Sequence, residues 1–312
     1  MFRSLFVCMF VVAADDFVRS KSVKLLFEIP RPMQGNPVCG VATLDNELFF
    51  SRLQMSQIQV YNATTGAHVR SLPIPDANTC GLVACGFFRC LYFVATRYNA
   101  VYKLSLVENS TAMNASPLGG QTACVLACGL SVNRDHNLLV AYYSAHKVQE
   151  YTTDGVLVRE LNLQPHITYP IQVVELHSGL YGVIHYGRPT GGYSVIDRQG
   201  QVVRNFSDEK SLAQLRSTIN PSHLPTTDYM PGYSLIEYRN GRVFIAKFAN
   251  QSDSKILVFH ENGKAEFLPD AICGALNGPS CMRYDASTNK LYIGEWSGGR
   301  VLCFGMKSTE TS

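Results

Sequence analysis

The sequence predicts an all-β fold, a six-bladed β-propeller with four-stranded blades, and three observations support it. A block of short strands recurs six times along the 312 residues, at the period of about 40 to 50 residues that is typical of propeller blades. Each block repeats one order: an apolar strand, a second apolar strand, a strand led by Lys, Arg or Gln, and an outer strand. The last block lacks its outer strand, whereas a strand-like segment that belongs to no block precedes the first.

The innermost strands give the spacing of the blades. Four of the five steps between successive starts are 41 to 48 residues long, and the step that leads to the fifth blade is 61 residues. The innermost strands are expected to start at Cys39-Gly40, Cys80-Gly81, Cys128-Gly129, Tyr169-Pro170, Met230-Pro231 and Gly278-Pro279.

The turns between third and outer strands carry glycine at a matching position. Tight hairpin turns often need a positive φ, which glycine adopts without strain. Such turns are expected to end at Gly66, Gly155, Gly200 and Gly263. The 89 residues between Gly66 and Gly155 leave room for a second blade whose turn lacks this glycine.

The N-terminal strand is expected to complete the sixth blade. Residues 23–30 have strand composition, and the sixth block ends after three strands with only the polar tail 307–312 behind it. Pairing the two ends removes exposed sheet edges, which otherwise invite aggregation. The propeller is therefore expected to span residues 23–306 as one domain, with an insertion at 207–230 before the fifth blade.

Residues 1–14 resemble a short signal peptide, with Val12 and Ala14 as the small residues before a cleavage site. Two other interpretations of residues 1–14 are that they come from the choice of start codon in the gene model, or that they form a buried apolar extension of the fold. Acceptor sequences for N-glycosylation begin at Asn62, Asn109, Asn205 and Asn250, so secretion is favoured over a cytoplasmic location. The sequence has no apolar run of 18 residues, and no membrane span is expected.

The ten cysteines favour a packing role over metal binding. Cys39, Cys80 and Cys128 occupy one repeat position at the start of neighbouring inner strands, as small buried residues do. The spacings of Cys80, Cys85 and Cys90 do not match a zinc ribbon. Cys273 and Cys281 flank a Gly/Asn/Pro loop and are the local disulfide candidates. No metal site or cofactor is expected.

The second and third strands resemble those of NHL repeats. The pattern is clearest in residues 138–151 and 291–304, and it recurs in residues 243–259 and 57–61. The acidic residue that usually ends the second strand of an NHL repeat is kept only at Glu295, while we align Ser51, Thr96, Tyr142, His185 and Lys247 with it in the other blades. The resemblance covers nearly the whole chain.

The resemblance implies two classes of function. NHL propellers joined to RING and B-box modules are protein- or RNA-binding platforms, and the RNA binders use a basic top surface; this sequence contains no RING or B-box. Related six-bladed propellers, such as the peptide-amidating lyase and the gluconolactonase and strictosidine-synthase-like groups, are enzymes with metal ligands or acids at the channel mouth.

One face of the propeller disc is the expected recognition surface. The loops that join second to third strands, and those that enter each inner strand, should lie on it together. Most blades bring a cation beside an aromatic ring there, which could stack bases or engage an acidic peptide. The competing interpretation is that a cation at the start of the third strand belongs to the repeat, with a packed stem and a solvated head. The recognition face comprises Arg52, Arg97, Tyr98, Tyr143, His146, Lys147, His185, Tyr186, Arg188, Lys247, Phe248, Trp296 and Arg300.

The most economical function is a non-enzymatic platform that binds a protein or peptide through this face. RNA binding is the first alternative, and the net charge of +3 argues against it because the chain has no strong overall positive field. A metal-dependent hydrolase or lyase that uses His146, His185 and Glu295 is the second alternative. The sequence carries no nucleophile elbow, phosphate loop or dinucleotide fingerprint.

Overall fold

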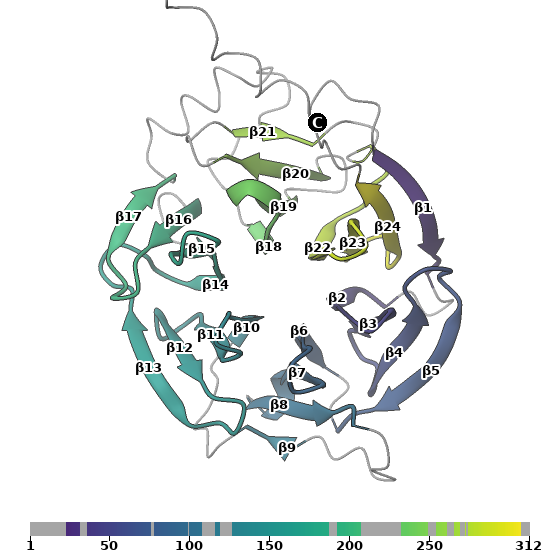
Figure 1. The fold of residues 1–312 in the computed structure, drawn as a ribbon, viewed down its shortest axis with the longest axis horizontal. Coiled ribbons are helices and arrows are strands. Elements are labelled where there is room, and N and C mark those ends of the chain that lie inside the picture. Colours follow the sequence, from purple (N-terminus) through teal and green to yellow (C-terminus); the bar gives the residue numbers. More distant parts are fainter. Residues whose placement is uncertain are drawn as a thin grey trace, which may run out of the picture.

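The computed structural model shows a closed ring of six four-stranded antiparallel sheets around a central axis (Figure 1). It describes residues 23–31, 36–75, 78–98, 100–107, 116–118, 127–186, 192–206, 232–248, 254–260, 265–268, 272 and 274–306. The predicted six-bladed β-propeller is confirmed. Several sequence predictions fall outside the described residues: 1–14, 207–230, 307–312, Asn109, Arg188, Asn250, Gly263 and Cys273.

The first three blades follow one another along the chain. Blade 1 contains β2 (Val38–Leu44), β3 (Glu47–Arg52), β4 (Gln57–Asn62) and β5 (His68–Pro73). Blade 2 contains β6 (Thr79–Cys85), β7 (Cys90–Ala95), β8 (Ala100–Ser105) and the short β9 (Ser116–Pro117), with the 3₁₀ turn η1 (Thr96–Tyr98) after β7. Blade 3 contains β10 (Ala127–Val132), β11 (Leu138–Tyr142), β12 (Lys147–Tyr151) and β13 (Leu157–Asn162).

The remaining blades complete the ring. Blade 4 contains β14 (Pro170–Glu175), β15 (Tyr181–His185), β16 (Gly192–Ile196) and β17 (Val202–Asn205). Blade 5 contains β18 (Gly232–Glu237), β19 (Val243–Phe248), β20 (Ser254–Phe259) and β21 (Ala265–Phe267), with the 3₁₀ turn η3 (Arg239–Gly241) between β18 and β19. Blade 6 contains β22 (Pro279–Asp285), β23 (Lys290–Glu295), β24 (Val301–Met306) and β1 (Val23–Ile29).

The ring closes as the sequence predicts. β1 pairs antiparallel with β24, from Val23 opposite Met306 to Ile29 opposite Val301 (Figure 1). The register shifts between Leu25 and Phe27, so one bulge interrupts the pairing. Ile29 is buried in a cluster that joins blade 6 to blade 1. The closing strand is thus both paired and packed.

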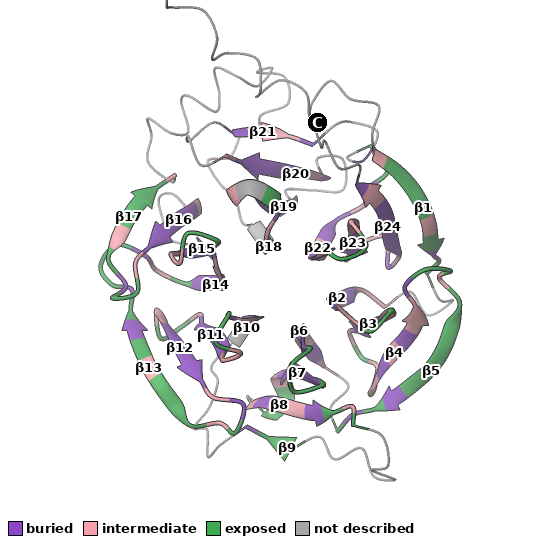
Figure 2. Cartoon of the chain, viewed as in Figure 1, coloured by how far each residue is buried: buried purple, intermediate pink, exposed green. Residues whose placement is uncertain are grey.

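Burial is highest in the second strands of the blades and lowest in the outer strands at the rim, as Figure 2 shows. β7, β11 and β15 are buried at every position, whereas β5 and β13 are largely exposed. Second strands are covered by a blade on each side and are mostly apolar, whereas outer strands are more polar because one side meets water. In the described part of the chain, no helix is long and apolar enough to cross a membrane.

The glycine turns are confirmed at three positions. Gly66, Gly155 and Gly200 have φ values of 71°, 83° and 84°. A Cβ at Gly66 would also approach within 2.7 Å of the Phe27 ring, which belongs to β1. This position therefore needs glycine both for the turn and for the close approach of the closing strand.

Candidate binding surface

The blade topology gathers two sets of loops at one end of the disc, which we call the top face. In an antiparallel meander the loops from second to third strands and from outer to next inner strands share one end. The first residue of each inner strand pairs with the last, or next to last, residue of the second strand. The six equivalent positions are Arg52, Ala95, Tyr142, His185, Lys247 and Glu295. The alignment of Ser51 and Thr96 with this position is corrected, because the register places Arg52 and Ala95 there.

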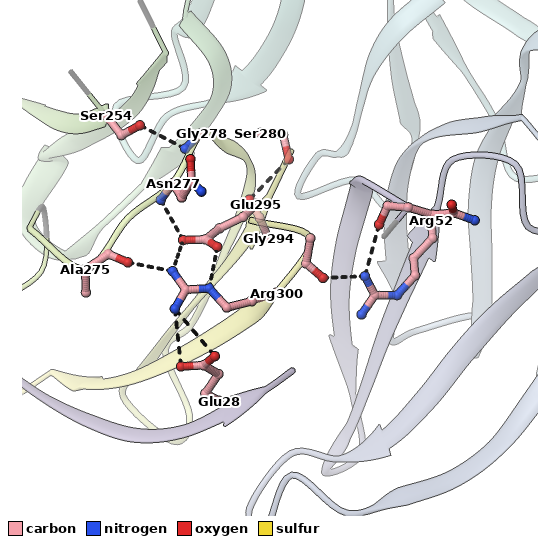
Figure 3. Close-up of polar contacts among 12 residues, drawn as sticks. Glu28, Arg52, Ser254, Ala275, Asn277, Gly278, Ser280, Gly294, Glu295 and Arg300 are labelled. Atoms are coloured by element: carbon pink, nitrogen blue, oxygen red, sulfur yellow. Dashed lines mark hydrogen bonds and ion pairs between the residues drawn. The ribbon is translucent and has the colours of Figure 1, made fainter. Parts of the chain in front are cut away.

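Glu295 is fully buried and forms an ion pair with Arg300 (Figure 3). Arg300 Nε donates to Oε2 at 2.7 Å and Nη2 donates to Oε1 at 2.8 Å, while the backbone N–H of Asn277 also donates to Oε1 at 2.7 Å. The bidentate hydrogen bond that Arg300 donates to Glu295 raises the pKa of Arg300. Arg300 further contacts Glu28 of β1, so it connects the closing strand to the top of blade 6.

Arg52 is buried and does not face solvent. Its Nε donates to Gln59 Oε1 at 2.8 Å. Its Nη1 donates to the carbonyls of Asn36 and Gly299, and Figure 3 draws these two hydrogen bonds. Only 1% of the residue is exposed, and this burial lowers the pKa of Arg52 to about 10. Because Gly299 belongs to the loop before β24, Arg52 ties blade 1 to blade 6.

His185 is likewise buried, with 3% of its surface exposed. Its Nε2 lies 3.0 Å from Ser194 Oγ on the neighbouring strand β16. Its Nδ1 has no hydrogen-bond partner among the described residues. Burial lowers the pKa of His185 to about 4, so the imidazole is neutral at pH 7.

Lys147 is engaged within blade 3. Its Nζ donates to Glu160 Oε2 at 2.8 Å and lies 5.7 Å from the ring centre of Tyr142. The head group is partly solvated and its charge is matched by a carboxylate on β13. This geometry supports the interpretation that a cation at this point belongs to the repeat pattern.

An aromatic cluster lies where blades 3 and 4 meet at the top face. It consists of Tyr143, His146, Tyr169 and Tyr186: the ring of Tyr143 lies 4.9 Å from Tyr169 and 6.2 Å from Tyr186, and His146 meets Tyr169 edge-on at 4.5 Å. The N–H of Tyr169 donates to His146 Nδ1 at 2.9 Å. Tyr169 is 39% exposed and the other three are half-buried. The cluster therefore offers aromatic surface on a fixed scaffold.

The other expected residues lie apart from this cluster. Arg97 and Tyr98 form η1 of blade 2, where the guanidinium lies 5.9 Å from the ring centre of Tyr98. Trp296 follows β23 in blade 6 and is 42% exposed. Lys247 and Phe248 lie at the end of β19, with only their backbone described. The structure thus brings together the blade 3 and 4 residues and leaves the others distributed around the ring.

The donors expected for a catalytic metal do not converge. In the ranges described, no three His, Cys, Asp or Glu side chains form a group that could hold a metal ion. Both oxygens of Glu295 accept hydrogen bonds from Arg300, and His146 Nδ1 accepts one from Tyr169. These residues do not fit the metal site of the hydrolase or lyase alternative.

The fold of the chain resembles those of several solved structures. It superposes on a streptogramin B lyase with a TM-score of 0.62, at 10% identity, covering 92% of this chain and 98% of that one. The virginiamycin B lyase of Staphylococcus aureus, in an inactive variant with quinupristin, gives a TM-score of 0.62 at 12% identity over 91% of this chain and 100% of that one. Hydrazine synthase of Kuenenia stuttgartiensis gives a TM-score of 0.57 at 14% identity over 84% of this chain and 74% of that one.

These similarities show the fold alone. No family model matches the sequence, and no curated protein does either. The six-bladed propeller is therefore established, while the NHL assignment stays a prediction.

The sequence interpretation missed two features of this surface. Tyr169 marked the start of an inner strand, and its exposed ring at the centre of the aromatic cluster was not expected; its φ of 53° turns the chain there. The interaction of His185 with Ser194 was also missed, although the pairing of β15 with β16 could have indicated that the two side chains lie on the same face of the sheet.

Proposed function

We propose that this protein is a non-enzymatic binding platform that recognises a protein or peptide segment through the aromatic cluster at the top of blades 3 and 4. The observation that supports it is a group of four rings, Tyr143, His146, Tyr169 and Tyr186, held in mutual contact and incompletely covered. Tyrosine supplies large, rigid contact area with a polar group at its end, which is why it is enriched at the centres of protein interfaces.

The charges support a peptide over a nucleic acid. Three of the cations expected on the recognition face are engaged: Arg52 is buried, while Lys147 and Arg300 pair with carboxylates. A cation binds an RNA phosphate strongly only if it is not already paired within the protein. These three cations therefore favour a peptide over RNA. The NHL-like strand pattern fits the same proposal, because propellers of that family act as binding platforms.

The proposal is tested by selecting peptides from a random phage-displayed library on the immobilised wild-type protein. Selected peptides are expected to lose at least about tenfold in affinity for a Tyr143→Ala/Tyr169→Ala variant, since hot-spot aromatic residues contribute this much. The matched control is Phe87→Ala, which removes an aromatic residue that is 68% exposed in the turn between β6 and β7, at the opposite end of the disc. Peptides that bind the double variant as tightly as the wild type would contradict the proposal.

A further inference from the structure

The central channel holds a cavity at the end opposite to the top face. Its volume is about 470 Å³, and innermost strands of all six blades line it. Gly86 and Phe87, in the turn between β6 and β7, and His136, in the turn between β10 and β11, lie at this end. The ring of Phe87 stacks on His136 with centroids 4.3 Å apart. Cavities of this size accept small organic molecules.

One level of the channel wall has an unusual composition. The strand registers place one residue of each inner strand at the same height, opposite the residue that lies three positions before the equivalent top-face position of the second strand. Four of the six are apolar, and the two polar ones, Ser131 and Arg283, come from blades 3 and 6, which lie across the ring from each other (Figure 1). The six residues are Ala42, Val83, Ser131, Val174, Ile236 and Arg283, and all of them line the cavity.

Both polar residues have unused hydrogen-bonding capacity. Arg283 Nε donates to Thr43 Oγ1 at 3.3 Å, whereas Nη1 and Nη2 donate to no protein acceptor in the described part of the chain. Ser131 is 9% exposed, and its Oγ has no partner among the described residues. Burial lowers the pKa of Arg283, opposed by the nearby charge of Asp285. A half-buried guanidinium with donors to spare favours an anionic acceptor.

The other charged residues around the cavity are already engaged and limit the charge of that acceptor. Glu175 pairs with Arg198 and accepts from the N–H of Arg134, and Glu237 accepts from the N–H of His177. The carboxylate of Asp285 accepts hydrogen bonds from Ser287 and Thr288. Glu175 and Glu237 line the same cavity as Arg283, so they disfavour a doubly charged group such as a phosphate more than a group with one negative charge, which Arg283 can match.

We propose that the channel cavity is a binding site for a small organic carboxylate, whose carboxylate pairs with Arg283 and whose apolar body lies against the channel wall. The guanidinium fork suits the two oxygens of a carboxylate. Leu82, Leu130 and Met282 supply apolar surface in the same cavity. This site is separate from the aromatic cluster and does not depend on the function proposed for it.

The test compares 3-phenylpropanoate with its neutral analogue 3-phenylpropanamide on the full-length protein. Methionine methyl groups are labelled with ¹³C, and the Met282 signal, assigned with Met282→Leu, reports on the cavity directly. The carboxylate is expected to shift this signal saturably with a dissociation constant of about 5 mM or lower, as its number of atoms allows. The amide is expected to bind at least about tenfold more weakly, because it lacks the charge-assisted pair.

Two variants complete the experiment. Arg283→Gln is expected to abolish the preference for the carboxylate, whereas Arg70→Gln, which removes an exposed arginine from β5, leaves it unchanged. If Arg283→Gln does not fold, as judged by circular dichroism, the comparison of the two ligands on the wild type decides. Equal shifts by acid and amide, no saturable shift at Met282, or an unchanged preference in Arg283→Gln would overturn the proposal.

Discussion

At the level of single residues, Arg52 connects distant parts of the chain, because its guanidinium donates to the carbonyl of Gly299, which lies 247 residues away. Such a contact exists only after the ring has closed, and no local pattern reports it. Lys147 differs from Arg52, because its contacts with Glu160 and Tyr142 lie within its own blade. The repeat pattern alone could therefore indicate them.

His185 makes stability depend on pH. The pKa of His185 falls from its usual 6.5 to about 4 in the folded protein, so between these values the unfolded chain binds a proton that the native state does not. Stability is therefore present above pH 6.5 and is lost as the pH falls. We expect the wild type to lose about 2 kcal/mol more than a His185→Gln variant between pH 7 and pH 5. Urea unfolding at the two pH values measures the difference, and parallel losses would show that His185 titrates normally.

Arg300 is expected to stabilise the folded protein by neutralising the buried carboxylate of Glu295. Replacing Arg300 by Met leaves a fully buried carboxylate without its cation, which should cost about 3 kcal/mol in the free energy of unfolding. Arg70→Met breaks an ion pair with Glu47 whose arginine is 42% exposed, and should cost about 1 kcal/mol or less. Denaturant unfolding of both variants checks this, and equal costs would mean that Glu295 is solvated.

At the level of elements, the sequence predicted the six blades because each strand type has its own pattern. Inner and second strands are mostly apolar, and glycine marks the turns at Gly66, Gly155 and Gly200. The short β9 shows where the pattern weakens, since it has two residues, Ser116 and Pro117. A proline cannot donate to a sheet ladder, so an outermost position suits it.

The closing strand β1 is expected to stabilise the ring chiefly through Ile29. This residue is 2% exposed, so Ile29→Ala should lower the free energy of unfolding by about 3 kcal/mol. Leu26→Ala in the same strand is the control, because Leu26 lies at the bulge and is 45% exposed, and it should change stability by about 0.5 kcal/mol or less. Similar losses in both variants would mean that β1 acts through backbone pairing alone.

At the level of the whole molecule, the position of the aromatic cluster could be predicted from the sequence, whereas that of the channel cavity could not. The top face follows from blade topology, so its position was predictable. The channel cavity needs the relative heights of all six inner strands, and these depend on bulges that shift the register in every blade. The position of Arg283 in the middle of an inner strand was a signal available in advance.

The charge of the whole molecule predicts weak RNA binding. With a net charge of +3 and several top-face cations engaged, a single-stranded RNA 12-mer should bind with a dissociation constant above about 10 µM at physiological salt. Fluorescence anisotropy of a labelled oligonucleotide measures it. Tighter binding that weakens steeply with added salt would favour the RNA alternative over a peptide platform.

The pairing of β1 with β24 imposes an order on the synthesis of the chain. β1 leaves the ribosome before any blade is complete, but the strand that it pairs with is the last one of the propeller. Throughout elongation, β1 carries unpaired backbone groups and the apolar residues Leu25, Phe27 and Ile29. The unpaired β1 therefore exposes the nascent chain to aggregation, and gives chaperones a segment to protect, until β24 emerges and the ring closes.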